Sequence, residues 1–500
     1  MQKAAIYNRW FFRLGGGEKH AFAFAEALRD LGYHTELLTH LWFDKKEAEK
    51  KLHVNLSGID LKIIPNLLDS QLSSYTKEYD IFINNSYLDF IQNRSKKGIL
   101  SVLFPSPLRT SFITKMKRSV IIPFLRRLFI FPLSISGVHQ GNILGPKVQI
   151  VFNESFIKEV HLKLSFQLLA FSVLDKIQFL SGEKKIQPQD RFVDVRKNIV
   201  TFVFNNLHEA RDKGLIILLP HSPYAENIQL QNLTIPGLRN SLYGIFSKIF
   251  RSWELRLHGG INNISIPIIS SYQHIVVNSE YTKHWVKKYW GVDSEVLYPP
   301  IDLVPKSIIK KNWIVNVGRF FRSGHSKKQY EMVNFFRELY DGGKKEWELH
   351  FIGTTEEGAT HKEYFEKVKT AAQGYPIYFH NNSDYQELGK IVSESKIYWH
   401  ATGYGEDEET NPEMMEHFGQ TTVEAMKAGC VPIVYAKGGQ LEIVDKKVGF
   451  VWNTKEELIA YTKKIMEDRE LLMKMSCESQ KKAASYNIET FRNKLQEIIN

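Results

Sequence analysis

Apolar and polar positions at the start of the chain follow three successive patterns. Residues 3–8 form a short and mostly apolar run, which is typical of a buried strand. A glycine-rich loop follows. Residues 18–31 then carry apolar side chains at helical spacing until Gly32, a residue that suits a helix end. Residues 34–38 return to a strand-like pattern, so the order predicts a strand–loop–helix–strand unit.

The same order returns in the second half of the chain. Residues 313–317 read as a buried strand, and a glycine-containing loop follows them. Residues 328–340 show helical spacing, and residues 347–352 form another apolar run. Such units are typical of parallel sheets, so we predict an α/β fold in which one Rossmann-like architecture occurs twice.

The boundary between the two units is expected near residue 302. The chain has 500 residues, more than the roughly 250–300 that one core normally serves. Pro299 and Pro300 end a strand-like run and break regular structure. We therefore predict an N-terminal domain over 1–302 and a C-terminal domain over 303–484. A final helix within 485–500 is expected to pack back toward the N-terminal domain.

A different pattern interrupts the first half. Residues 148–206 contain several runs in which apolar and polar side chains alternate, as in half-buried strands. We interpret this segment as a β-rich insertion in the N-terminal domain. It is expected to serve acceptor recognition or self-association and not to touch the ligand of the C-terminal domain.

The composition describes an ordinary globular protein, with 43% hydrophobic and 24% charged residues. The two cysteines, Cys430 and Cys477, cannot form a disulfide framework and lack the spacing of a metal site. No apolar run reaches the 18 residues of a membrane span, and no secretory pattern precedes the first strand. We therefore predict a cytoplasmic protein.

Charge is distributed unevenly between the halves. Residues 301–500 contain 28 Lys+Arg and 30 Asp+Glu, a net charge of −2. Subtraction from the chain's 66 bases and 55 acids leaves 38 and 25 in residues 1–300, a net charge of +13. The interval 90–153 holds no acidic residue and ten basic ones. Such asymmetry indicates different partners for the two halves.

The segment 109–134 interleaves six bases with large apolar side chains. Each base near an anionic membrane contributes about 1 kcal/mol of attraction, so this segment predicts peripheral contact with such a surface. A buried apolar strip with a solvated basic edge is the alternative interpretation. Nucleic acid would also suit a basic face, but the sequence has no motif for it, so no nucleic-acid partner is expected.

Candidate chemistry is concentrated in the stretch EHFGQTTVE, residues 416–424. It follows a predicted strand and opens a helix, and ligands of such sheets bind at the carboxyl ends of strands. Glu424, one turn into the helix, could accept the vicinal hydroxyls of a ribose, while Glu416 lies outside the helix and could face a sugar ring. The alternative is that Glu416 only caps the helix and Glu424 is only solvated.

Two cations could complete an anion site here. Free N–H groups at a helix start favour an anion by about 0.3–1 kcal/mol, too little for a diphosphate. Arg319 and Lys327 follow the strand 313–317 and could each add roughly 1.5–3 kcal/mol through charge-assisted hydrogen bonds.

The stretches GRFFRSGHSKKQYEMV, EHFGQTTVEAMKAGCVPIVYAKGGQLEIV, NSEYTKHWVKKYWG and VLYPPID resemble retaining glycosyltransferases of family four. The motif EHFG is similar to that of their dolichol-linked mannosyltransferases. The resemblance is strong over 273–450, weaker over 1–110 and absent over 134–240. It implies a GT-B fold, in which two Rossmann-like domains face a central cleft.

The resemblance also implies roles for individual residues. Arg319 and Lys327 match the cations on the donor diphosphate, with Lys328 as the alternative lysine. Glu416 matches the glutamate that faces the donor sugar, and Glu424 the one that holds the nucleotide ribose. The remaining matched positions are Phe418, Gly419, Gly438 and Gly439 on the donor and Gly16 and Gly17 in an acceptor-side loop.

The implied activity is transfer of a hexose from a nucleotide sugar to a glycan or lipid-linked acceptor, with retention of configuration. The donor would be a GDP- or UDP-sugar, used without a metal or a further cofactor. Polysaccharide, lipopolysaccharide or other glycoconjugate biosynthesis is the expected context.

One position departs from the family pattern. Many members carry a histidine in the N-terminal domain beside the reacting sugar, where this chain has Phe104 and Pro105. His221 could replace it, or could be an ordinary loop histidine. Two other classes also stay open: a catalytically inactive carbohydrate-binding GT-B protein, and a dinucleotide-dependent oxidoreductase. The loop RLGGGEKH does not match the G-x-G-x-x-G pattern of the latter.

Overall fold

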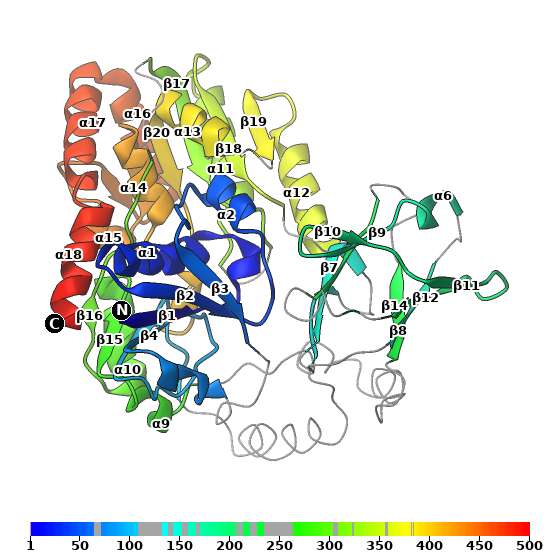
Figure 1. Cartoon of the computed structure of the whole chain (residues 1–500). Helices are drawn as coiled ribbons and strands as arrows, with labels where there is room; N and C mark the ends of the chain where they lie inside the picture. Colours follow the sequence, from blue (N-terminus) through cyan, green and yellow to red (C-terminus); the bar gives the residue numbers. More distant parts are fainter. Residues whose placement is uncertain are drawn as a thin grey trace.

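The computed structural model shows two parallel sheets with their helices and a separate antiparallel part (Figure 1). The predicted membrane-contact segment 109–134 lies outside the described residues except for Leu133 and Ser134, and His221 lies outside them as well. The structure describes residues 2–64, 72–108, 133–138, 144–152, 159–166, 171–205, 207, 214–220, 228–234, 264–303, 309–322, 325–355, 359–381, 383 and 385–500.

The first parallel sheet contains seven strands of the described chain, in the order β16-β15-β5-β4-β1-β2-β3. Ala4 to Tyr7 are all fully buried, as expected for a strand covered on both faces. The strands are β1 (Lys3–Tyr7), β2 (His34–Thr39), β3 (Ile59–Ile63), β4 (Ile81–Asn84), β5 (Lys97–Val102), β15 (His274–Val277) and β16 (Glu295–Val296).

The second parallel sheet has the order β19-β18-β17-β20-β21-β22 within the described ranges. The predicted strand 313–317 lies in its centre as β17, and the chain passes from one sheet to the other between β16 and β17. Its strands are β17 (Lys311–Val317), β18 (Glu348–Gly353), β19 (Ile377–Asn381), β20 (Ser395–His400), β21 (Val431–Tyr435) and β22 (Phe450–Trp452).

Helices connect the parallel strands, as the alternating pattern predicted. With the first sheet lie α1 (Gly16–Asp30), α2 (Lys45–Leu52), α9 (Ile266–Ile269) and α10 (Glu280–Trp290). With the second lie α11 (Gln329–Asp341), α12 (Ala359–Ala372), α13 (Tyr385–Glu394), α14 (Gln420–Lys427), α15 (Gln440–Ile443), α16 (Lys455–Glu467) and α17 (Arg469–Ala483); α18 (Ile488–Ile499) ends the chain. Short 3-10 helices span Phe11–Arg13, Tyr75–Glu78 and Pro412–Met414.

Helix α1 starts earlier than the sequence pattern indicated. Gly16 and Gly17, expected in a loop, form its first turn. The N–H of Gly15 donates to the Glu18 carboxylate at 2.8 Å, which satisfies one backbone donor at the helix start. A side chain at Gly17 would approach Leu103 to 3.1 Å, so glycine here permits close packing.

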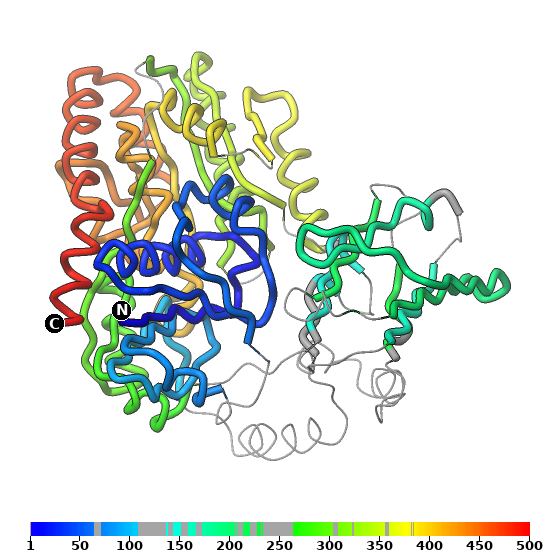
Figure 2. The backbone as a smooth tube through the Cα atoms, in the orientation of Figure 1, coloured from blue at the N-terminus to red at the C-terminus, as the bar shows by residue number. Residues whose placement is uncertain are grey.

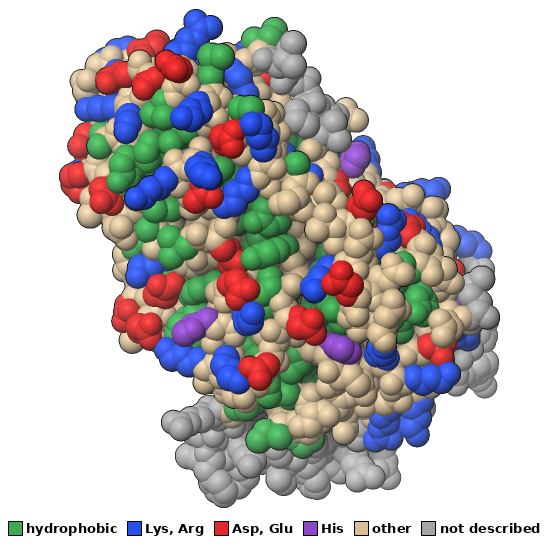
Figure 3. Space-filling model, turned by 90° about the vertical axis from the view of Figure 1, so that its left-hand side faces the viewer, with side chains coloured by type: hydrophobic (Ala, Val, Ile, Leu, Met, Phe, Trp, Pro, Cys, Tyr) green, Lys and Arg blue, Asp and Glu red, His purple; other side chains and the backbone are tan. Residues whose placement is uncertain are grey.

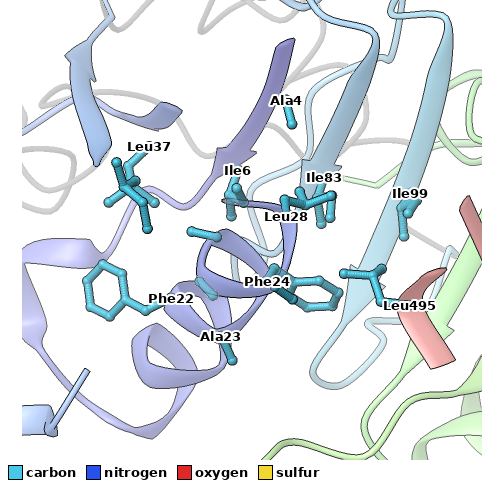
Figure 4. Close-up of a cluster of buried hydrophobic side chains, with 14 of the residues drawn as sticks. Ala4, Ile6, Phe22, Ala23, Phe24, Leu28, Leu37, Ile83, Ile99 and Leu495 are labelled. Carbon is cyan, nitrogen blue, oxygen red and sulfur yellow. The ribbon is translucent and has the colours of Figure 1, made fainter. Parts of the chain in front are cut away.

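Helix α18 returns to the first sheet. Its residues Phe491 and Leu495 are buried in the same cluster as Phe24 of α1 and Ile99 of β5, and Figure 4 shows Leu495 beside Phe24 and Ile99. Arg492 also forms an ion pair with Asp30 at 3.2 Å. The last helix of the chain therefore helps to build the core of the first half.

The antiparallel strands extend beyond the predicted insertion 148–206 at both ends. One described sheet has the order β10-β9-β13-β7-β6 and the other β11-β12-β8-β14. They enclose their own apolar cluster and lie to one side of the two parallel sheets (Figure 2). The strands are β6 (Leu133–Val138), β7 (Leu144–Phe152), β8 (Glu159–Ser165), β9 (Gln178–Ser181), β10 (Lys184–Ile186), β11 (Asp190–Asp194), β12 (Ile199–Asn205), β13 (Leu215–Leu218) and β14 (Gln229–Thr234), with helix α6 (Phe171–Leu174).

Basic and acidic side chains intermingle on the face shown in Figure 3, so the basic excess is not gathered there. None of the helices within the described ranges combines the length and the apolar character that crossing a membrane requires.

Candidate active site at the seam between the two parallel sheets

Hydrogen bonds join the carboxyl edges of the two parallel sheets. The Gln420 side chain, at the start of α14, donates to the carbonyl of Gly16 at 3.3 Å. The Ser279 hydroxyl, just before α10, donates to the carbonyl of His417 at 2.5 Å. Both contacts place the stretch 416–424 directly against the first sheet. We call this boundary between the carboxyl edges of the two sheets the seam. Ligands of open α/β sheets bind at such carboxyl edges, so the predicted site lies where the fold favours one.

Glu416 is held on one side only. Its Oε2 accepts from Lys327 Nζ at 2.6 Å and lies 3.3 Å from His400 Nε2. No hydrogen-bond partner of Oε1 is found among the described residues. The carboxylate is therefore fixed through one oxygen, while the other remains available to a ligand.

The electrostatic environment keeps Glu416 ionised. Burial by itself would raise its pKa, but the Lys327 ammonium, with His325 and His400, lowers the pKa well below its usual range. Burial also lowers the pKa of His400. We call the group formed by Glu416, Lys327 and His400 the first corner of the site. At neutral pH this corner therefore contains a carboxylate, an ammonium and a neutral imidazole.

The structure distinguishes the two adjacent lysines that the sequence left open. Lys327 forms the ion pair with Glu416, and its side chain is 18% exposed. Lys328 adopts a left-handed backbone with φ of 57° as it enters α11, and its Nζ pairs instead with Glu406 at 2.7 Å. Backbone conformation therefore directs neighbouring lysines to different carboxylates, and Lys327 is the one at the predicted site.

Arg319 lies two residues beyond the end of β17 and is exposed. Its charge acts on Glu18 in the first turn of α1, where burial raises the pKa of the carboxyl and Arg319 is among the groups that oppose the rise. The charge of Arg319 is therefore felt at the glycine-rich helix start of the first sheet, and its role on a diphosphate stays a prediction.

The three predicted donor-side glycines allow close packing, Gly438 and Gly439 against backbone atoms and Gly419 against a side chain. A Cβ at Gly438 would lie 2.3 Å from the Glu416 carbonyl, and one at Gly439 would lie 2.4 Å from that of His417. Gly439 N–H donates to the Glu416 carbonyl at 2.8 Å. Gly419 has φ of 111°, and a side chain there would meet Gln440 at 2.3 Å. The glycines thus allow the EHFG backbone to lie directly on the following loop.

Phe418 points away from the seam. Its side chain is 3% exposed and packs between Tyr298 and Tyr486, with ring centroids 5.5 and 5.6 Å away. This buried ring anchors the motif in the core and leaves only the backbone of Phe418 to approach a ligand, as the resemblance implied.

Glu424 occupies a second corner, on the first turns of α14. Its nearest cation is Lys19 of α1, with 3.7 Å between Lys19 Nζ and Glu424 Oε1. Burial raises the pKa of Glu424, and Lys19 opposes the rise. The predicted ribose carboxylate therefore faces a lysine of the other sheet.

A stack of rings crosses the seam beside Glu416. The rings of Phe104 and His417 are nearly parallel at 4.1 Å between centroids, and the ring of His325 also stacks on His417 at 5.0 Å. Phe104, at the position where the resemblance led us to expect a histidine, thus contacts the EHFG motif directly. His325 Nε2 lies 2.6 Å from the Met415 carbonyl, so it supports the chain just before Glu416.

Sequence reasoning missed four of these residues. His325 precedes Lys327 by two positions, and His400 ends strand β20. Because both lie near candidate residues or strand ends, the sequence alone could have indicated them. His417 lies within the EHFG motif, but its stacking on Phe104 was not foreseen. Lys19 carried no local signal, because its partner Glu424 comes from a distant part of the chain.

Solved structures share this two-sheet architecture. The structure of Anabaena HepE in complex with UDP-glucose matches with a TM-score of 0.53, 11% identity, and coverage of 100% of this chain and 99% of that chain. Sucrose-phosphate synthase from Thermosynechococcus elongatus matches with a TM-score of 0.52, 11% identity, and coverage of 100% and 98%. At such identities the similarity shows the fold alone, and the predicted GT-B class is confirmed.

Comparison of the sequence with protein-family models adds a family to the fold class. Residues 304–482 match the family model of glycosyl transferases group 1, which confirms the predicted resemblance. The matched residues include all described strands of the second sheet and both Glu416 and Glu424.

Two curated relatives carry mannosyltransferase names. The GDP-Man:Man(3)GlcNAc(2)-PP-Dol alpha-1,2-mannosyltransferase of Dictyostelium discoideum is 23% identical over 51% of this chain and 50% of its own length. Alpha-1,3/1,6-mannosyltransferase ALG2 of Homo sapiens is 26% identical over 35% of this chain and 45% of its own length. The alignments thus span about half the length of these relatives.

Proposed function

We propose that the chain is a glycosyltransferase that moves a hexose from a nucleotide sugar to a glycan or lipid-linked acceptor with retention of configuration. The observation that carries the proposal is the Lys327–Glu416–His400 cluster at the carboxyl edge of the second sheet, within the part that matches group 1 glycosyltransferases.

The cluster suits the departure of a diphosphate. Negative charge develops on the leaving group as the sugar–oxygen bond breaks, and fixed cations and helix starts stabilise it without reorganisation. Lys327 supplies one such cation, Arg319 a second, and the N–H groups at the start of α14 add a partial positive charge. Glu416 Oε1 faces the sugar in this proposal, and its ionised form favours the positive charge that grows on the ring.

Two nucleotides are candidates for the donor. The Dictyostelium relative is named for GDP-mannose, and the HepE structure holds UDP-glucose. We therefore propose a GDP- or UDP-hexose, held at its ribose by Glu424, with no metal and no other cofactor.

The acceptor side is proposed to meet a membrane. The name of the Dictyostelium relative specifies a glycan linked to dolichol through a diphosphate, and a lipid-linked or growing glycan would suit the present chain as well. The basic and apolar segment 109–134 would bring the N-terminal domain to the cytoplasmic face of an anionic membrane. No nucleic-acid partner is proposed.

A panel of nucleotide sugars tests the donor proposal. Purified protein is mixed with GDP-mannose, UDP-glucose and UDP-N-acetylglucosamine, and thermal unfolding and release of nucleotide are measured. A donor at 100 times its Kd adds about 2.7 kcal/mol to the unfolding free energy, so the nucleotide sugar that the protein uses should raise the melting temperature clearly. The anomeric configuration of the product is then read by NMR, and retention is expected.

Protein that binds free glycans but neither binds nor hydrolyses any nucleotide sugar would instead be an inactive carbohydrate-binding GT-B protein. Stabilisation by NAD(H) alone would favour an oxidoreductase.

Vesicle binding tests the membrane proposal separately. Replacement of Lys117, Arg118, Arg126 and Arg127 by Gln should abolish binding to anionic liposomes and leave donor binding intact. Binding by the unchanged protein should weaken with salt, because the Debye length falls from about 8 Å at physiological strength to about 3 Å at 1 M. An unchanged protein that ignores such vesicles at low salt would point to a soluble acceptor.

A further inference from the structure

Lys19 occupies an unusual position for an ammonium group. It lies on the second turn of α1 in the first sheet's domain, and only 8% of the residue is exposed. Its Nζ is buried and has no hydrogen-bond partner among the described residues. Taking an ammonium out of water is costly unless its donors are used, so three unused donors indicate a group prepared for a ligand.

Glu424 lies opposite Lys19 but does not satisfy it. The 3.7 Å between Lys19 Nζ and Glu424 Oε1 is longer than a hydrogen bond between nitrogen and oxygen. The other nearby lysine, Lys427, donates to the backbone carbonyl of Ile301. The Lys19 ammonium, which can only donate, and the Glu424 carboxylate, which accepts, thus lie on two sides of the same place without a hydrogen bond between them.

Tyr385 adds a third polar group to this place. Its hydroxyl is buried and has no partner in the described part of the chain. Lys19 Nζ lies 5.0 Å from the centre of the Tyr385 ring, and the charge of Glu424 contributes to raising the Tyr385 pKa after burial, so the three groups are neighbours. His53 of the first domain stacks on the same ring at 5.2 Å and 20°.

The chemistry of these groups selects the ligand. A phosphate oxygen would accept from Lys19 but would meet the carboxylate of Glu424 at close range, where like charges repel. A hydroxyl both donates and accepts, so it can donate to Glu424 and accept from Lys19 at once. A second, adjacent hydroxyl can use the hydroxyl of Tyr385 in the same way.

We propose that Lys19, Tyr385 and Glu424 form a composite subsite for the vicinal hydroxyls of a ribose, to which the first domain contributes Lys19. The inference rests on the proposed function and extends it: the ribose end of the nucleotide is held between both domains, not by the C-terminal domain alone. Lys19 therefore determines specificity for ribonucleotides over deoxyribonucleotides.

Calorimetric titration with UDP, GDP and their 2′-deoxy and 3′-deoxy analogues tests the subsite. Unchanged protein should bind the better ribonucleotide roughly ten-fold or more tightly than at least one deoxy analogue, since each factor of ten corresponds to about 1.4 kcal/mol. Lys19→Met, which keeps most of the side-chain volume, should lose most of that preference. Tyr385→Phe, which removes one hydroxyl, should lose part of it.

A matched control separates the subsite from general contact between the domains. Lys288 of α10 also forms an ion pair across the seam, 2.7 Å from Glu409, but at another place. Lys288→Met should keep the ribose preference of the unchanged protein. Lys19→Arg, which retains the charge, should keep more of the preference than Lys19→Met, and melting temperatures confirm that each variant is folded.

The outcomes are distinguishable. Unchanged protein that binds no nucleotide would contradict the proposed function itself. Binding by unchanged protein together with a full ribose preference in Lys19→Met would overturn the inference while the function stands. Equal weakening of ribo- and deoxyribonucleotides by Lys19→Met would assign Lys19 to another part of the ligand and would also overturn it. If Lys19→Met does not fold, Tyr385→Phe decides in the same way.

Discussion

The two glutamates of the stretch 416–424 lie in corners that have different sets of partners. Glu416 is paired with Lys327 of its own domain at 2.6 Å, and its pKa is lowered well below the usual range. Glu424 faces Lys19 of the other domain at 3.7 Å, and its pKa is raised, mainly by burial. One corner is preorganised within a single domain, whereas the other is left incomplete across the seam.

This difference suggests separate roles. A carboxylate that is already ionised and oriented suits charge stabilisation during a reaction, because no reorganisation is needed when charge develops. A carboxylate with unsatisfied neighbours suits ligand binding, because the ligand supplies the missing hydrogen bonds. We expect changes at the first corner to lower kcat and changes at the second to lower affinity.

The largest effect is expected from Lys327→Ala. Loss of one fixed donor at a developing charge costs roughly 10²–10³-fold in kcat. The matched control is Lys328→Ala, since Lys328 also pairs with a glutamate but not with Glu416. Steady-state kinetics with the identified donor should show a small change for Lys328→Ala.

Stability must be separated from activity in that experiment. Removal of one partner of a buried ion pair costs about 3–5 kcal/mol, although this pair is partly exposed and should cost less. The double variant Lys327→Met with Glu416→Gln removes both charges, so it should regain stability and stay inactive. If it regained activity together with stability, the corner would be structural and not catalytic.

A smaller effect is expected from Glu424→Gln. A hydrogen bond to a charged group contributes about 1.5–3 kcal/mol, so nucleotide affinity should fall roughly ten-fold or more while kcat at saturating donor changes little. Calorimetry of nucleotide binding and kinetics over a wide donor range distinguish the two parameters. A kcat loss as large as that of Lys327→Ala would remove the contrast between the corners.

The ring stack beside Glu416 should make stability depend on pH. Burial, with a further contribution from Lys327, lowers the pKa of His417 from 6.5 to about 4, although Glu416 and the Glu413 carbonyl oppose this. The unfolded chain binds the proton first, so stability from this residue is present above pH 6.5 and is lost as pH falls toward 4. The loss should be roughly 2 kcal/mol after allowance for partial exposure.

His417→Phe should reduce this slope, because phenylalanine can stack on Phe104 without titrating. Urea unfolding at pH 7, 5.5 and 4.5 compares the variant with the unchanged protein. Identical slopes would show that His417 is protonated in the folded protein as readily as in the unfolded one.

The smallest effect is expected from chelation. If Lys327, Arg319 and the helix starts carry the diphosphate, treatment with EDTA should leave the transfer rate unchanged. Loss of activity that manganese restores would show that the cations of this cleft are insufficient by themselves.

The sequence alone determined the repeated architecture and the positions of the candidate site residues relative to the strands and helices. The strand at 313–317 and the helix starting at Gln420 follow from local periodicity, and local periodicity survives in any context that buries one face. The same reasoning placed Glu416, Gly438 and Gly439 at strand ends. The predicted insertion 148–206 was too short. The strands β6 and β14 of the antiparallel part lie outside the segment in which apolar and polar residues alternate clearly.

Only the tertiary structure decided which groups face each other. The sequence could not choose between Lys327 and Lys328, because the choice depends on the left-handed backbone of Lys328 and on Glu406, far along the chain. It could not show that Lys19 faces Glu424 or that Phe104 stacks on His417, because those contacts form only when two separately folded sheets meet. Spacing along the chain specifies elements, whereas contacts between distant elements depend on how their surfaces pack.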